Sequence, residues 1–92
     1  MIAVSEIEKI LKTYFSNSQV LVEDLTGSSD HFQVWVVSSM FQGKNLVEQH
    51  QMVYQALRDQ MKEAIHALTL KTYTPEDWQK LQANQPGPKS IT

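Results

Sequence analysis

Three histidines are the side chains of this sequence best suited to bind a metal. They stand at positions 31, 50 and 66, with spacings that match no short metal-binding motif. Cysteine is absent. Without a thiol, the chain cannot by itself form a disulfide, a thiolate zinc site, a redox pair or a cysteine nucleophile. A soft metal bound here therefore needs sulfur from another molecule.

The positions of the histidines favour different roles. His50 falls on the apolar stripe of a predicted helix, which favours a packed, hydrogen-bonded imidazole over a ligand. His31 opens a predicted strand beside a polar loop, so surface exposure is its default interpretation. His66 lies where a helix ends and a strand begins. The helix dipole favours a cation there, so a structural role and a ligand role have equal weight.

Other residues with chemical potential are few. The serines at 28, 29, 38 and 39 lie in no Gly-x-Ser-x-Gly context. The Glu23–Asp24 carboxylates diverge along a predicted strand, and those of Glu76–Asp77 are explained by a helix start. We therefore expect a binding protein and not an enzyme.

Phosphate binding has one candidate position. The three glycines form neither a P-loop nor a dinucleotide motif, but Gly43–Lys44 directly precedes a predicted helix. Backbone N–H groups at such a position can contact phosphate, although a plain loop and cap is the simpler interpretation. The formal charge of −2 weakens a nucleic-acid function without excluding a local patch.

Length and composition limit the kind of protein. The chain has 92 residues, of which 41% are hydrophobic and 20% charged, as expected for one small globular domain. No stretch approaches the roughly 20 consecutive apolar residues of a membrane span. The start Met-Ile-Ala-Val-Ser-Glu lacks the layout of a signal peptide. We expect a cytoplasmic protein without membrane association.

The first half of the chain predicts a helix and a hairpin. Ser5 and Glu8 form a capping box before apolar residues at helical spacing, which predicts a helix over about 5–15. Val20–Leu25 predicts a strand, and a turn-rich segment follows to Asp30. His31–Val37 predicts a second strand, antiparallel to the first. Its two faces are Phe32, Val34 and Val36 on one side, and Gln33, Trp35 and Val37 on the other.

The second half predicts a helical block, a strand and a short helix. Asn45 with Glu48 repeats the capping signature, and a break is expected near Arg58–Asp59. Alternation predicts a third strand from His66 to Tyr73, and Thr74-Pro75-Glu76-Asp77 starts a short helix. The stripe predicted to be buried on the long helix comprises Leu46, His50, Val53, Tyr54, Leu57 and Met61.

This order indicates an α+β fold with one three-stranded sheet and helices packed on one face. We expect one domain over residues 1–83 and a flexible tail over 84–92, which holds two of the three prolines and almost no apolar residues. If the second and third strands pair in parallel, the long helical block is a crossover connection.

Several segments together resemble the BolA family. They span about residues 5–80 without large gaps and comprise Thr26-Gly27, His31 to Ser38, Phe41-x-Gly43-Lys44, Val47-x-x-His50-Gln51-Met52-Val53-Tyr54 and Ile65 to Pro75. The resemblance implies an αββααβ fold similar to class II KH domains. It also implies a monothiol glutaredoxin as partner, in iron–sulfur cluster handling and iron regulation.

The resemblance further implies a metal site shared between two proteins. In such a complex a two-iron, two-sulfur cluster is bridged by the glutaredoxin cysteine, a glutathione thiol and a BolA histidine, which by motif corresponds to His66. Some members add a His or Cys from the loop between the first two strands. Serine stands here where some relatives carry cysteine, so His31 is the candidate for a second ligand. The isolated chain is expected to hold no cofactor.

Some bacterial members of this family bind DNA and regulate transcription. The resemblance makes this the alternative function, with Gly43 and Lys44 in the nucleic-acid-binding loop. The helix start carries Glu48, Gln49 and Gln51, where relatives are often more basic. Fewer cations mean weaker attraction for phosphate. A homodimer is a further expectation when the partner is missing.

Overall fold

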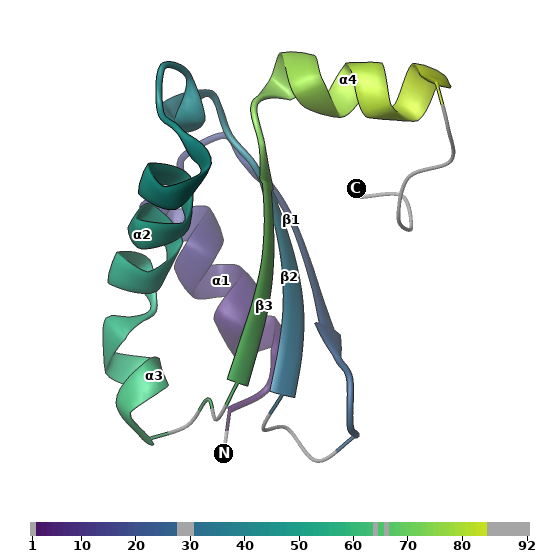
Figure 1. The fold of residues 1–92 in the computed structure, drawn as a ribbon. Coiled ribbons are helices and arrows are strands. Elements are labelled where there is room, and N and C mark those ends of the chain that lie inside the picture. The colour runs from purple at the N-terminus through teal and green to yellow at the C-terminus, as the bar shows by residue number, and fades with distance from the viewer. Residues whose placement is uncertain (1, 28–30, 64, 66, 85–92) are drawn as a thin grey trace.

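A computed structural model describes residues 2–27, 31–63, 65 and 67–84 of the chain. It shows an α+β fold in which the elements follow the order αββααβ, with a short 3₁₀ helix after the second strand and a fourth α-helix at the end (Figure 1). In chain order the elements are α1 (Val4–Tyr14), β1 (Gln19–Asp24), β2 (His31–Val37), η1 (Ser39–Phe41), α2 (Leu46–Ala56), α3 (Arg58–Glu63), β3 (Ala67–Tyr73) and α4 (Pro75–Asn84). The predicted fold class is confirmed.

The three strands form one mixed sheet with β2 in the centre. β1 pairs antiparallel with β2, from Gln19 opposite Val37 to Asp24 opposite Phe32. β3 pairs parallel with β2, from His31 opposite Ala67 to Val37 opposite Tyr73. The helical block α2–α3 is therefore the crossover between two parallel strands, as expected.

The helices α1, α2 and α3 lie on one face of the sheet, where the main core forms (Figure 1). Phe32, Val34 and Val36 of β2 point into this core, and Ile7 and Leu11 of α1 meet them. Burying such side chains is the main driving force for a domain of this size. The two faces predicted for β2 are confirmed, and the face with Phe32, Val34 and Val36 is the one in the main core.

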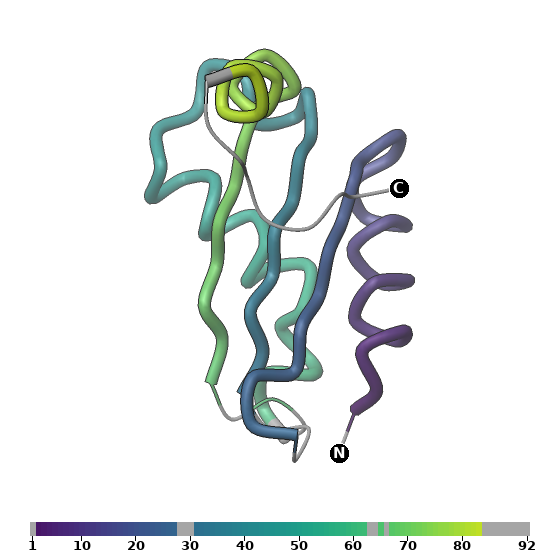
Figure 2. The backbone as a smooth tube through the Cα atoms, turned by 90° about the vertical axis from the view of Figure 1, so that its right-hand side faces the viewer, coloured from purple at the N-terminus to yellow at the C-terminus, as the bar shows by residue number. Residues whose placement is uncertain are grey.

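The opposite face of the sheet carries a second, smaller cluster. Trp78 of α4 packs with Trp35 and Val37 of β2, and Tyr73 lies against Trp78 with a ring-centroid distance of 5.1 Å. Figure 2 shows α4 end-on above this face. The predicted three-stranded sheet with helices on one face thus gains a terminal helix that covers one end of the other face.

The first helix starts differently from its prediction. α1 begins at Val4 with Ala3 as its N-cap, and the Glu6 side chain accepts a hydrogen bond from the Ala3 N–H at 3.4 Å. The Ser5–Glu8 capping box is therefore wrong. Glu8 pairs instead with Lys12 at 3.4 Å, one helical turn on.

The second helical block confirms the predicted cap and corrects the predicted stripe. Asn45 accepts from the Glu48 N–H at 2.8 Å, and Glu48 accepts from the Asn45 N–H at 2.9 Å. The helix breaks at Leu57, one residue before the predicted position. Val53 and Leu57 are buried, but Leu46 is 59% exposed and Tyr54 is 41% exposed, so their predicted burial is wrong.

The orientation of α2 on the sheet explains the exposed residues. The Thr72 hydroxyl of β3 donates to the Gln49 side-chain oxygen at 2.7 Å. The side of α2 that carries Gln49 and the buried Val53 therefore faces the sheet. Tyr54, five residues after Gln49, lies away from this side, and Leu46 is the first residue of α2, where a helix is less enclosed than in its middle.

The remaining boundaries differ little from prediction. β1 begins and ends one residue earlier than expected, and β2 has the expected bounds. The Asp77 N–H donates to the Thr74 hydroxyl at 3.2 Å, which confirms the start of α4. The predicted tail from residue 85 on lies outside the described residues, and α4 includes Asn84. Within the described ranges, no helix has the length and apolar character needed to cross a bilayer.

Candidate functional site

His31 is the first residue of β2 and is half-buried. Its carbonyl accepts a hydrogen bond from the Leu25 N–H at 2.9 Å, which closes the hairpin, and its partner on the other side is Ala67 of β3. Among the described residues, the imidazole makes no hydrogen bond or ion pair. The backbone of His31 is fixed on both sides while its ring nitrogens have no partner within that part of the chain.

His66, the residue predicted to ligate the cluster, lies outside the described residues. Both of its sequence neighbours are anchored. Ile65 is buried, and its N–H donates to the Gln60 carbonyl at 2.9 Å. Ala67 begins β3 opposite His31. The register therefore places the residue that follows His66 in the sequence beside the other candidate ligand.

The hairpin loop before His31 is shaped by its first residues. The Asp24 carboxylate accepts from the N–H groups of Thr26 and Gly27, at 3.3 Å and 3.0 Å. Gly27 has φ +77°, a left-handed conformation that glycine adopts without strain. Ser28, Ser29 and Asp30 lie outside the described residues. The turn chemistry predicted for this loop is seen in its first half.

The described residues offer an incomplete ligand set. They contain no group of three or more His, Cys, Asp or Glu side chains placed to hold a metal ion. An iron–sulfur cluster of this kind needs four protein or small-molecule ligands, usually thiolates. Among the described residues, the His31 imidazole at the start of β2 is a single candidate ligand and not a complete set.

His50 is half-buried on α2, as its predicted packing role requires. Its Nε2 atom is buried and has no hydrogen-bond partner among the described residues. The predicted hydrogen bond is therefore lacking at this nitrogen. A buried polar atom without a partner costs about 1–3 kcal/mol.

Gly43 and Lys44 lie beyond the other end of β2, in the loop between η1 and α2. Gly43 has φ +77°, and the Lys44 side chain is exposed. Three backbone donors here have partners: the Lys44 N–H donates to the Phe41 carbonyl at 3.1 Å, and the capping box binds those of Asn45 and Glu48. The exposed Lys44 ammonium group is the candidate side-chain contact for phosphate here.

Lys44 also borders a surface hollow that the sequence analysis did not identify. This hollow has a volume of about 430 Å³ and is lined by Tyr14, Lys44, Glu48, Gln51, Met52 and Gln55. Tyr14 is among the residues at helical spacing in the first predicted helix, and it is 44% exposed. Its position as the last residue of α1 was the available signal, because a helix end is less enclosed than its middle.

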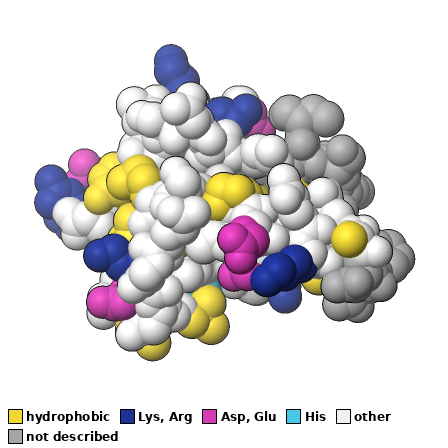
Figure 3. Space-filling view, turned by 90° about the horizontal axis from the view of Figure 1, so that it is seen from above, with side chains coloured by type: hydrophobic (Ala, Val, Ile, Leu, Met, Phe, Trp, Pro, Cys, Tyr) yellow, Lys and Arg dark blue, Asp and Glu magenta, His cyan; other side chains and the backbone are white. Residues whose placement is uncertain are grey.

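The charged side chains at this end of the molecule are mixed in sign. Figure 3 shows the lysine and arginine side chains in separate places, several of them beside an acidic group, without one continuous basic patch. Ion pairs such as Lys80–Glu76 at 3.6 Å account for part of this mixing. The electrostatic attraction for a long phosphate backbone is correspondingly weak on this face.

Comparison with known proteins gives a consistent result. The BolA-like protein family matches residues 7–77. Protein BOLA2 of Arabidopsis thaliana is 40% identical over 80 residues, which cover 85% of this chain and 85% of that protein. The DNA-binding transcriptional regulator BolA of Vibrio cholerae is 47% identical over 64 residues, which cover 70% of this chain and 58% of the relative.

Solved structures agree with the sequence matches. A BolA protein homologue from Coxiella burnetii superposes with a TM-score of 0.75 at 35% identity, covering 86% of this chain and 99% of the homologue. The mixed three-stranded sheet and its helices are therefore shared with this group of structures.

Proposed function

The chain belongs to the BolA family, and from this premise we propose that it binds a monothiol glutaredoxin and completes the coordination of a glutathione-dependent two-iron, two-sulfur cluster. His66 is the proposed principal ligand, and His31 is the candidate for the second. The proposed role is that of an adaptor in iron–sulfur cluster trafficking or iron regulation, with no enzymatic activity of its own.

The β2–β3 register is the observation that carries this proposal. It sets His31 opposite Ala67, the residue directly after His66, at one end of the sheet. Ile65, directly before His66, is buried and hydrogen-bonded to Gln60. The described residues on both sides of His66 are thus held in place, and Ala67 lies beside His31. A ligand between anchored neighbours favours a defined metal geometry.

The absence of cysteine supports the sharing of ligands. Thiolates must come from the partner and from glutathione, and this chain supplies nitrogen. Replacement of thiolate by imidazole raises the reduction potential of a cluster, as in Rieske centres. The second ring nitrogen of a ligating histidine usually donates to a carbonyl or carboxylate, and we expect such a contact for His66.

A titration of cluster-loaded monothiol glutaredoxin tests the proposal. The visible circular dichroism spectrum is recorded in glutathione as the wild-type chain is added. We expect a new spectrum that saturates at one chain per cluster. The reason is that imidazole from this chain replaces thiolate from one of the two glutaredoxin subunits. The His66→Ala variant is expected to lose this spectrum. If His31 is the second ligand, the His31→Ala variant gives a spectrum that differs from that of the wild-type complex.

His50→Leu is the matched control. This variant removes an imidazole whose Nε2 atom has no partner among the described residues. It replaces the imidazole by an apolar side chain of comparable size. The cluster spectrum should be unchanged by this variant. The proposal is contradicted if the wild-type spectrum stays that of glutaredoxin alone, or if His66→Ala forms the same complex with equal affinity.

DNA binding is the second candidate function. It is favoured by the Vibrio cholerae relative, which is named a DNA-binding transcriptional regulator, and by the exposed Lys44 ammonium. Duplex affinity that falls steeply with salt, and falls again in Lys44→Ala, would support this function. Affinity that is insensitive to both changes would exclude it. Lys80→Ala, on α4, is the matched control.

A further inference from the structure

The surface of α1 and of the neighbouring part of α2 holds two hollows that the proposed cluster function does not use. One is lined by Lys9, Ile10, Thr13 and Tyr14 of α1 and has a volume of about 340 Å³. The other, of about 430 Å³, reaches from Tyr14 to Lys44 and to the side of α2 that carries Gln51 and Met52. Tyr14 lines both. We call this continuous surface the α1–α2 groove.

The groove combines an apolar floor with a rigid aromatic side chain. The hollow beside Ile10 has almost wholly apolar walls. The Tyr14 ring packs edge-on against Phe15 at 4.9 Å, and Phe15 packs against Phe41 at 5.2 Å; both phenylalanines are fully buried. Tyr14 is therefore supported from below by the core. A supported aromatic surface loses little entropy when a ligand binds.

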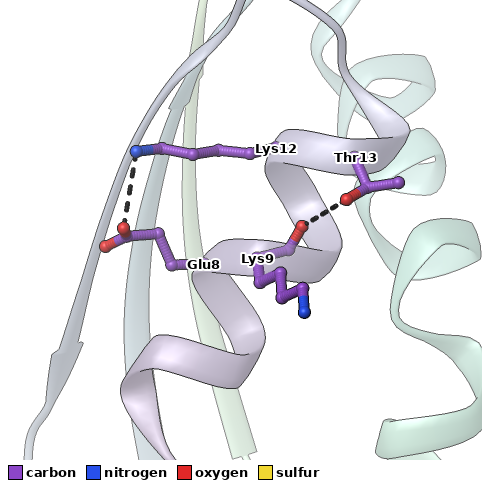
Figure 4. A network of polar contacts seen from close by, with 4 residues as sticks. All are labelled: Glu8, Lys9, Lys12 and Thr13. Carbon is purple, nitrogen blue, oxygen red and sulfur yellow. Dashed lines mark hydrogen bonds and ion pairs between the residues drawn. The ribbon is translucent and has the colours of Figure 1, made fainter.

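Two cations without an acidic partner stand at the groove. Figure 4 shows the Lys12 side chain paired with Glu8, whereas the Lys9 side chain points in another direction. The Lys9 backbone carbonyl accepts a hydrogen bond from the Thr13 hydroxyl at 2.8 Å. Neither Lys9 nor Lys44 forms an ion pair within the part of the chain that the structure describes. Glu48 is the one acid among the lining residues, and its carboxylate accepts the Asn45 N–H.

The groove is thus locally basic on a chain whose formal charge is −2. We propose that it is a docking surface for an acidic segment of a partner protein, with a bulky apolar side chain on the floor beside Ile10 and Tyr14 and carboxylates near Lys9 and Lys44. This surface is distinct from the start of β2, and the proposal does not depend on the cluster function.

The shape and charge of the groove favour this occupant over others. Both hollows are shallow and open, whereas small-molecule sites usually enclose most of their ligand. A nucleic acid draws its affinity from many phosphate contacts, and two lysines beside one carboxylate supply few. An apolar hollow flanked by cations suits a peptide in which acidic residues surround an aliphatic or aromatic anchor.

The test uses a short synthetic peptide rich in glutamate with one central Leu-Phe pair. Amide chemical shifts of the ¹⁵N-labelled full chain are followed as the peptide is added. We expect shifts confined to residues that line the groove, and weaker binding when Leu-Phe becomes Ser-Ser or when glutamine replaces glutamate. Both peptide changes remove interactions that the groove provides.

Charge reversals in the chain provide the decisive comparison. Lys9→Glu and Lys44→Glu should each weaken peptide binding roughly tenfold, because each places a like charge against the peptide. Lys71→Glu, an exposed lysine on β3 outside the groove, makes the same change in net charge and should leave binding nearly unchanged. All three side chains are exposed, so we expect each variant to fold. Dispersed amide signals in its spectrum verify this.

Several results would overturn the proposal. These are a peptide that shifts no groove residue, a Lys71→Glu variant that loses as much affinity as Lys9→Glu, or an oligothymidylate that binds the groove more tightly than the peptide. Self-association of the free chain that Lys9→Glu abolishes would assign the groove to a second copy instead.

Discussion

The two ends of β2 differ in how their polar groups are used. At its start, His31 has a fixed backbone and an imidazole without a described partner. Beyond its end, the Lys44 N–H is used in a turn, those of Asn45 and Glu48 are used in the capping box, and the Lys44 side chain is exposed. The first end presents an imidazole, and the second presents an exposed ammonium group.

This difference allows the two candidate functions to be tested separately. Seven residues of strand separate the ends, which corresponds to ~20 Å at about 3.3 Å per residue. Variants this far apart with no shared partner usually have additive effects on stability. A change at Lys44 should therefore leave cluster assembly intact, and a change at His31 or His66 should leave the α1–α2 groove intact.

The largest expected effect concerns the core that both ends share. Phe32, next to His31, and Phe41, in η1, are both fully buried in the same cluster. Either residue changed to alanine should lower the free energy of unfolding by about 3–5 kcal/mol, because an aromatic side chain and its packing are lost. Urea denaturation measures both losses.

Met40→Ala is the control for this pair, since Met40 is exposed beside Phe41 and its loss should change stability by no more than about 0.5 kcal/mol. If Phe41→Ala lowers the free energy of unfolding by less than about 1 kcal/mol, the segment after the end of β2 is not stabilised by the core that it shares with Phe32.

An intermediate effect is expected at the two loop glycines. Gly27 and Gly43 each have φ +77°, one at either end of β2, and an added Cβ would meet no atom within 4 Å. Alanine at either position should cost about 1–2 kcal/mol, because the left-handed conformation itself is strained for alanine.

Asparagine tolerates this conformation better, as Asn17 with φ 60° illustrates. The Gly→Asn variants should therefore recover part of the stability lost in the Gly→Ala variants. Thermal unfolding of the four variants provides the comparison. Equal midpoints for alanine and glycine at either site would contradict the assigned backbone conformation.

The smallest effect distinguishes the two predicted capping boxes. Asn45→Ala removes a side-chain cap with a hydrogen bond of 2.8 Å and should cost about 1 kcal/mol in urea denaturation. Ser5→Ala should change stability by no more than about 0.5 kcal/mol, because Ser5 lies inside α1 and does not cap it. A larger loss for Ser5→Ala than for Asn45→Ala would reverse the structural assignment.

These contrasts show which features could be predicted from the sequence. The Asn45–Glu48 cap and the bounds of β2 depend on local hydrogen bonds and on side-chain alternation, which short-range patterns express directly. The Ser5–Glu8 pattern predicted the wrong cap for α1, because the N-cap is Ala3, whose side chain has no acceptor that a short-range pattern could identify. Local patterns do not distinguish such alternatives.

Tertiary geometry accounts for the remaining differences. The exposure of Tyr54 depends on which side of α2 faces Thr72, and the helical repeat alone does not specify that side. The proximity of Tyr14 to Lys44 likewise depends on how α1 lies against α2. For the candidate metal site, the sequence indicated which histidines to consider, and the parallel register of β2 and β3 showed that His31 and Ala67 are neighbours.

The central claim is that nitrogen from this chain ligates a cluster whose thiolates come from elsewhere. Pulsed electron paramagnetic resonance on the reduced cluster, formed with monothiol glutaredoxin, glutathione and the chain labelled with ¹⁵N-histidine, tests it most directly. The account predicts a ¹⁵N coupling of directly ligated imidazole that disappears in His66→Ala. A reduced cluster in the mixed complex without such a coupling would contradict it.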